Sequence, residues 1–259
     1  VELGFDPDLD GEVSAAEKLG RRDGEWQGVW KRFREAPRNY PNLPALLRRA
    51  RPAQGAFVFE GEPSETWPQD NESLEEALRE ALAGLQEKES SAARAAITSL
   101  EKEHGHRRGW VWAELGQSPL AMALRHLVEL AERTADPLLG AGVAGIVDRY
   151  AAEGWEVDAA ALSALACVRE NKGLEAVTGA LAALYRPWLR GACELFQEAW
   201  RTAPPAQPME NRAPEPGVVT LFSDGLRLDL GHLLADRLQA EGVSCKVEHT
   251  LAALPTITA

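Results

Sequence analysis

The sequence predicts a mainly α-helical amino-terminal region followed by the first βαβ unit of an incomplete α/β domain. Up to about Thr202, apolar residues recur roughly every three to four positions, which is typical of helices that bury one face. A proline-rich stretch follows. Beyond it the pattern changes to short apolar runs on either side of one helical stripe, which favours strands and a helix of an α/β sheet.

Residues 1–202 are expected to form a helical bundle or an irregular helical domain. Their helical faces are marked by Trp26, Trp30 and Phe33, and by Leu74, Leu78, Leu82 and Leu85. Further periodic stretches cover residues 121–133, 159–169, 174–184 and 188–200. Residues 61–71 are rich in Pro, Ser, Glu and Asp, and we expect a surface loop there.

The charge of the chain bears on its partners. The net charge is −12, and an acidic surface repels phosphate backbones, so direct nucleic-acid binding is not expected. We expect the basic clusters at residues 48–51 and 104–108 to lie on solvated helix faces. No apolar run approaches the roughly 18 residues of a membrane span, and no secretory leader opens the sequence. A cytoplasmic location without membrane contact is therefore expected.

Residues 203–217 contain five prolines and no apolar periodicity, and we interpret them as a linker. Residues 218–259 would then begin a second domain. Residues 218–222 read as a buried strand and residues 243–248 as a second strand. Between them a helix, with Asp229 as its N-cap, ends near Gly242 and carries the stripe Leu230, Leu233, Leu234 and Leu238. One βαβ unit cannot cover its own sheet, so we expect the domain to continue beyond Ala259.

Polar residues follow both predicted strands, where α/β enzymes place their ligands. Asp224 comes directly after the first strand and offers a hard oxygen ligand for a divalent cation. Thr256 and Thr258 come a few residues after the second strand. A metal that lowered the hydroxyl pKa would make either threonine a nucleophile. On physical grounds alone, the alternative also stays open that Asp224 and the two threonines have a purely structural role.

Two segments of the chain resemble a known family. The sequences LFSDGLRLD (residues 221–229) and LPTIT (residues 254–258) resemble the start of the PglZ domain, which belongs to the alkaline phosphatase superfamily and occurs in bacteriophage-exclusion (BREX) defence systems. The sequences RRGWVWA (residues 107–113) and YRPWL (residues 185–189) resemble the helical region that precedes it. On this resemblance the chain is truncated just after the Pro-Thr-x-Thr loop.

The resemblance implies roles for individual residues. Asp224 matches the first metal ligand of the superfamily, and Thr258 matches the nucleophile, which also binds metal; Thr256 is the alternative nucleophile. Arg227 would contact phosphate, because its planar fork suits oxyanions. An alternative for Arg227 is pairing with Asp229 or packing on the strand.

The resemblance also implies an activity, cofactors and partners. The parent protein would be a metal-dependent phosphoric ester hydrolase, a phosphatase or phosphodiesterase, with two divalent ions, zinc or manganese. Because the remaining ligands follow later in the family, this fragment alone is expected to be inactive. Other phage-defence proteins would be its partners. The alternative is a non-catalytic helical scaffold or interaction subunit of a defence complex.

A second motif lies at the amino-terminal end. Asp6, Asp8, Asp10 and Glu17, with Glu12 between them, fit the spacing of a calcium-binding loop, and Gly11 stands where that loop needs a sharp turn. Only five residues precede this stretch, so the usual entering helix is expected to be missing or truncated. Calcium binding and an acidic turn that caps the next helix both remain open.

Overall fold

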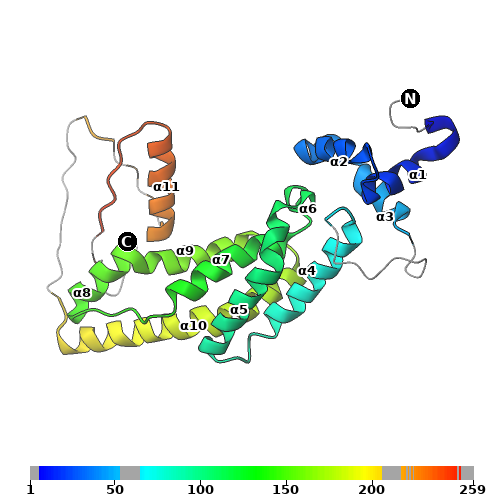
Figure 1. Cartoon of the computed structure of the whole chain (residues 1–259). Coiled ribbons are helices and arrows are strands. Elements are labelled where there is room, and N and C mark those ends of the chain that lie inside the picture. Colours follow the sequence, from blue (N-terminus) through cyan, green and yellow to red (C-terminus); the bar gives the residue numbers. More distant parts are fainter. Residues whose placement is uncertain are drawn as a thin grey trace.

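The computed structural model describes residues 6–52, 65–205, 217–219, 221, 223, 225–249 and 251. Over these residues the protein is mainly helical, as the sequence predicts for its amino-terminal region. Figure 1 shows three parts: a small group formed by α1 to α3 at one end, a bundle built on α4, α5, α7, α9 and α10, and α11 beside the bundle at the other end.

Most of the helices follow one another along the chain with short connections, whereas residues 51–67 separate α3 from α4 and residues 203–227 separate α10 from α11. Short 3₁₀ turns, η1 (Pro37–Asn39) and η2 (Gly105–Gly109), and one π-helical turn, η3 (Tyr150–Gly154), lie between them. The α-helices are α1 (Pro7–Arg21), α2 (Trp26–Glu35), α3 (Leu43–Ala50), α4 (Pro68–Ala83), α5 (Ser90–His104), α6 (Val111–Glu114), α7 (Pro119–Arg133), α8 (Gly142–Arg149), α9 (Trp155–Ala166), α10 (Asn171–Thr202) and α11 (Leu228–Ala240). Within the described ranges, no helix is long and apolar enough to cross a membrane.

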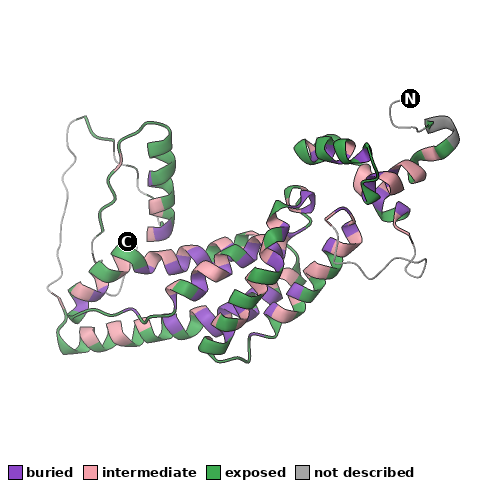
Figure 2. Cartoon of the chain, viewed as in Figure 1, coloured by how far each residue is buried: buried purple, intermediate pink, exposed green. Residues whose placement is uncertain are grey.

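The helical region has two hydrophobic cores rather than one. The larger joins α4, α5, α7, α9 and α10 around residues such as Leu82, Leu124 and Ala164. The smaller joins α1, α2, α3 and α6 around Trp30, Leu47 and other apolar side chains. Figure 2 shows the buried residues of the bundle facing inward between the helices, with exposed residues on their outer faces. This arrangement follows from the periodic apolar stripes, because each stripe needs a partner.

Helix α10 differs from the prediction because it runs through Pro187 as one helix of 32 residues. Proline has no N–H, so the carbonyl of Ala183, four residues earlier, loses its helical donor. The hydroxyl of Ser90 donates to this carbonyl oxygen at 2.8 Å. A side chain at the start of α5 therefore satisfies the group that Pro187 leaves free, which allows the two predicted stretches to join.

Neither predicted strand of the βαβ unit forms among the residues that the structure describes. Val219 and Leu221 are 94% and 91% exposed, and residues 243–249 belong to no helix or strand. A strand needs a neighbour for its backbone N–H and C=O groups, and the described part of the chain supplies none. The predicted helix between the strands is confirmed as α11, although it begins at Leu228 and its N-cap is Arg227 rather than Asp229.

The basic cluster at residues 104–108 does not lie on a solvated face, contrary to the sequence prediction. Arg107 is fully buried and His104 is 1% exposed. The Arg107 guanidinium donates to Glu75 Oε1 at 2.7 Å and to Asn71 Oδ1 at 2.9 Å. Asn71 belongs to the predicted surface loop at residues 61–71, but α4 begins at Pro68 and buries Asn71 completely.

Glu75 extends this buried cluster to the start of α7. Its carboxylate accepts hydrogen bonds from the backbone N–H of Leu120 at 2.9 Å and of Ala121 at 3.2 Å. These N–H groups belong to the first turn of α7, where no intrahelical acceptor is available. Ser118, just before α7, donates its hydroxyl to Asn71 Oδ1 at 2.8 Å. Arg107 and Glu75 thus tie α4, η2 and α7 together.

Burial lowers the pKa of His104 below its ordinary value of 6.5, and the neighbouring Arg107 acts in the same direction. The folded-state pKa therefore lies below the unfolded one, so His104 contributes stability that is present above about pH 6.5 and lost as the pH falls. We expect the free energy of unfolding to decrease between pH 7 and pH 5, and the decrease to be smaller in His104→Gln. Urea titrations across this range measure it. The same dependence of the free energy of unfolding on pH in both proteins would contradict a contribution from His104. Burial also lowers the pKa of His126, but His126 is present in both proteins and contributes equally to each.

Candidate functional site

The resemblance-based site residues fall unevenly on the structure. Asp224, Thr256 and Thr258 lie outside the described residues, so their roles stay predictions. Arg227 is described, directly before α11. The candidate functional site is therefore built from Arg227 and the residues that surround it.

Arg227 lies between two buried carboxylates. Its Nε donates to Asp229 Oδ1 at 3.0 Å, and its Nη2 lies 3.7 Å from Asp158 Oδ2. Asp229 is 5% exposed and Asp158 is 7% exposed, whereas the Arg227 side chain is 46% exposed. Pairing with Asp229, the sequence alternative for Arg227, is confirmed. Part of the Arg227 guanidinium therefore stays accessible to solvent.

Asp158 is the centre of this site. It lies on α9 and accepts hydrogen bonds from the hydroxyls of Tyr150, in η3, and Tyr185, on α10. Burial, and secondly the hydrogen bond to Asp158, raises the pKa of both tyrosines well above the ordinary 10.0. At neutral pH both hydroxyls are therefore proton-bearing donors, and neither is a general base.

An apolar cavity of about 680 Å³ lies next to these groups. Its walls come from α8, α10 and the segment around α11, and they include Ile146, Trp188, Phe196, Leu228 and Leu251. Asp158 and Tyr150 line it, and so do Glu248 and His249. His249 Nε2 lies 3.6 Å from Asp148 Oδ1 of α8. A mostly apolar hollow with a few polar groups is the usual form of a small-molecule site.

Helix α11 is fixed to the bundle through a small contact. His232 stacks on Trp155 of α9, with ring centroids 4.1 Å apart and planes at 12°. Ala235 and Asp229 are its buried residues. The predicted leucine stripe does not pack: Leu230, Leu233 and Leu234 are 43%, 50% and 50% exposed. Arg227 and His232 therefore hold α11 while most of its apolar face stays open to solvent.

No metal site forms among the residues that the structure describes, since they contain no group of three or more His, Cys, Asp or Glu that could hold an ion. At the predicted calcium loop, α1 is helical on both sides of Gly11, whose φ of 76° and ψ of 165° mark a kink. Asp10 Oδ2 accepts the backbone N–H of Asp6 at 2.9 Å, and Glu17 pairs with Arg21 at 2.6 Å.

These contacts support the alternative of an acidic turn that caps a helix. The side chain of Asp8 lies outside the description, and Glu12 is exposed. Calcium binding stays a prediction.

Sequence reasoning missed Asp158, Tyr150 and Tyr185. One signal was present: Asp158 interrupts an otherwise apolar stretch, and a carboxylate in such a position requires a buried partner. Its partners could not be named from the sequence, because Arg227 lies 69 residues further along the chain.

Comparison of the chain with protein-family models, with curated proteins and with solved structures gives no match. The resemblance to the PglZ domain therefore rests on the sequence motifs alone.

The tyrosines report on the charge of Asp158. Because their folded-state pKa values are raised, they contribute stability that is complete below pH 10.0 and lost as the pH rises further. Asp158→Asn removes the carboxylate, so we expect Tyr150 and Tyr185 to ionise at lower pH than in the unaltered protein. Tyrosinate absorbance measured against pH tests this, with Asp236→Asn, an exposed aspartate of α11, as the matched control. Superimposable titration curves for Asp158→Asn and the unaltered protein would exclude the proposed coupling.

Proposed function

We propose that residues 218–259 begin a metal-dependent phosphatase or phosphodiesterase domain of the PglZ type, and that residues 1–202 form the helical region that carries it in bacteriophage defence. The proposal is supported by the spacing of LFSDGLRLD and LPTIT. One structural observation adds to it: Arg227, inside the first motif, is paired with Asp158 of α9. The helical region therefore contacts a residue of the motif.

In this proposal the βαβ unit forms when further strands of the domain pair with residues 218–222 and 243–248. The open leucine face of α11 supports this idea, because a helix of an α/β domain covers a sheet with such a face. Leu230, Leu233 and Leu234 are about half exposed in the chain as described.

Asp224 and Thr258 carry the proposed chemistry, with Thr256 as the alternative nucleophile. A carboxylate and a hydroxyl are oxygen donors that suit a divalent cation such as zinc or manganese. Two donors are too few to hold the two ions of the superfamily, and the resemblance places the remaining ligands after this loop. We therefore derive no catalytic step for this chain and expect no turnover from it alone. Phosphoesters are the proposed substrates, and other defence proteins the proposed partners.

The test is hydrolysis of bis(p-nitrophenyl) phosphate by the parent protein that contains both this chain and the remaining ligands, assayed with Mn²⁺ and with Zn²⁺. Thr258→Ala removes the nucleophile, so we expect kcat to fall by at least about a thousandfold. Thr202→Ala, at the end of α10, is the matched control and should keep full activity. Loss only in Thr256→Ala would move the role to that residue. Activity that survives in both Thr256→Ala and Thr258→Ala would overturn the proposed nucleophile.

A non-catalytic scaffold is the second candidate function. The open apolar face of α11 also favours it, because exposed leucines in a row are typical of a surface that binds another protein. On this reading the parent protein hydrolyses no phosphoester with either metal. Asp224→Asn would then leave phage exclusion in cells unchanged, whereas the hydrolase proposal requires its loss.

A further inference from the structure

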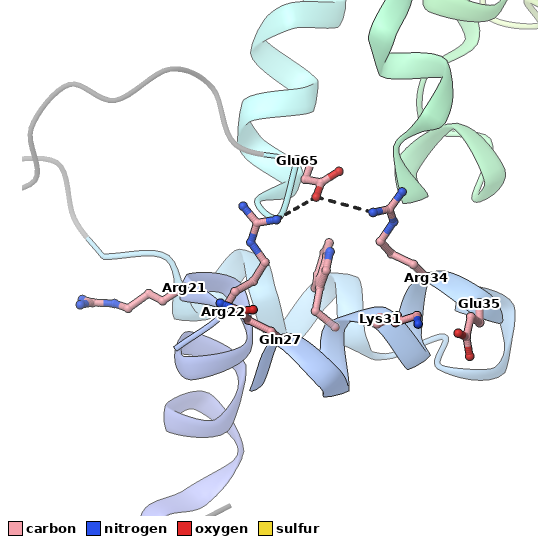
Figure 3. Close-up of a pocket in the computed structure, with 8 residues that line it drawn as sticks. Arg21, Arg22, Gln27, Lys31, Arg34, Glu35 and Glu65 are labelled. Carbon is pink, nitrogen blue, oxygen red and sulfur yellow. Dashed lines mark hydrogen bonds and ion pairs between the residues drawn. The ribbon is translucent and has the colours of Figure 1, made fainter. Parts of the chain in front are cut away.

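A basic pocket lies at the opposite end of the molecule from α11. It is a hollow of about 770 Å³ between the end of α1, α2 and the turn before α4. Four basic side chains line it, together with two acidic ones: Arg21, Arg22, Lys31, Arg34, Glu35 and Glu65. In Figure 3 the side chains of Arg22 and Arg34 reach toward Glu65 from either side. The pocket is net positive, although the chain carries a net charge of −12.

Two arginines converge on one oxygen atom in this pocket. Glu65 Oε1 lies 2.9 Å from Nη1 of Arg22 and 3.8 Å from Nη1 of Arg34. The backbone of Glu65 is fixed separately, because its carbonyl oxygen accepts the indole N–H of Trp112 at 2.9 Å. Arg22 also has a left-handed backbone, with φ of 59°, directly after the last residue of α1. A left-handed arginine is unfavourable, yet this one is held where its side chain meets Glu65.

Trp30 adds an unused hydrogen-bond donor. Its side chain lines the pocket and is 3% exposed, and its indole N–H has no acceptor among the described residues. Buried donors without an acceptor are rare in folded proteins, and a water or a ligand oxygen can supply the acceptor that the described side chains do not. Lys31, beside it, makes no ion pair within the same described ranges. The Glu65 carboxylate therefore pairs with the two arginines and leaves the Trp30 indole and Lys31 unused.

We propose that this pocket is a binding site for a phosphate group, and that Glu65 occupies the anion position when the ligand is absent. A tetrahedral dianion offers three terminal oxygens, so it can accept hydrogen bonds from Arg22, Arg34 and the Trp30 indole at the same time. A carboxylate is smaller than a phosphate and carries a single charge. Glu65 Oε1 lies 3.8 Å from Arg34 Nη1, which is too far for a hydrogen bond, so Arg34 is only loosely paired. The ligand class is therefore a terminal phosphate or pyrophosphate, free or on a nucleotide.

This site is separate from the proposed hydrolase site. The pocket is formed by α1, α2 and the turn before α4, and in Figure 1 these helices lie at the far end of the molecule from α11, which Arg227 directly precedes. Phosphate binding here does not depend on Asp224 or Thr258. The two proposals therefore fail or succeed independently.

Isothermal titration calorimetry of the chain with inorganic phosphate and with pyrophosphate tests the site, with AMP and ATP as further arms. We expect Arg34→Gln to weaken binding by roughly tenfold or more, because a charge-assisted hydrogen bond is lost. Arg149→Gln is the control, since Arg149 forms a surface arginine–glutamate pair with Glu153 of η3 outside the pocket, with side chains 57% and 49% exposed against 46% and 23% for Arg34 and Glu65. It should bind like the unaltered chain. Circular dichroism and Tm establish that each variant is folded.

A second set of variants tests the role of Glu65. Glu65→Gln removes the competing anion, so we expect phosphate to bind several-fold more tightly. Glu35→Gln removes one negative charge from the same pocket but leaves the Glu65 carboxylate between Arg22 and Arg34, so it should tighten binding less. Trp30→Phe keeps an aromatic ring in the core and removes only the N–H, and should weaken binding.

Three results would overturn the proposal: no binding heat with millimolar pyrophosphate even in Glu65→Gln, equal weakening in Arg34→Gln and Arg149→Gln, or equal tightening in Glu65→Gln and Glu35→Gln. A short single-stranded oligonucleotide without a terminal phosphate is the last arm. If it binds as tightly as pyrophosphate, the site recognises a phosphodiester backbone and the assignment to a terminal phosphate is wrong.

Discussion

One buried guanidinium joins the two cores of the helical region. Arg107 is fully inside the protein, where its charge is paired with Glu75 and its Nη2 also donates to Asn71. Its Nη1 lies 3.4 Å from His104 Nδ1, and its Nε has no acceptor among the described residues. Burying a charge is costly unless it is paired and hydrogen-bonded, and removing one partner of such a pair typically costs about 3–5 kcal/mol. Arg107 also lies over the ring of Trp110, which belongs to the smaller core, with 5.9 Å to the ring centroid.

The positions of both candidate sites follow from this junction. Glu75 holds the first turn of α7, and α7 packs along α9 in the larger core, which presents Asp158 to Arg227. On the other side, Trp112 follows Arg107 within a few residues and holds the backbone of Glu65 in the basic pocket. The Arg227–Asp158 pair and the basic pocket are therefore both linked, through neighbouring contacts, to the buried Arg107–Glu75 pair.

Much of the fold could be predicted from the sequence, because an apolar stripe is a local property. The stripes on α2, α4, α7 and α11 lie where the residue spacing places them. The pairing of Arg227 with Asp229 was also within reach, since the two residues are close in sequence. Pro187 misled the prediction, because the donor that replaces its missing N–H is Ser90, on another helix.

Buried charges are what the sequence does not reveal. Arg107 and His104 belong to a run of basic residues that resembles an exposed helix face. Arg107 can be buried because Glu75 pairs with its charge and Asn71 accepts a hydrogen bond from it, and both residues lie more than 30 positions earlier in the chain. The basic pocket is similar, since it needs Arg22, Arg34 and Glu65 from three separate segments. The strands at residues 218–222 and 243–248 depend on pairing that the described part of the chain does not provide.

Arg227, through Asp158, holds the segment that carries the LFSDGLRLD motif on the helical region. Amide hydrogen exchange of α11 in Arg227→Gln tests it most directly, with Arg237→Gln, an exposed arginine on the same helix, as the reference. We expect faster exchange throughout residues 228–240 in Arg227→Gln, with α4, α7 and α9 as protected as before. Unchanged protection of α11 in Arg227→Gln would contradict it.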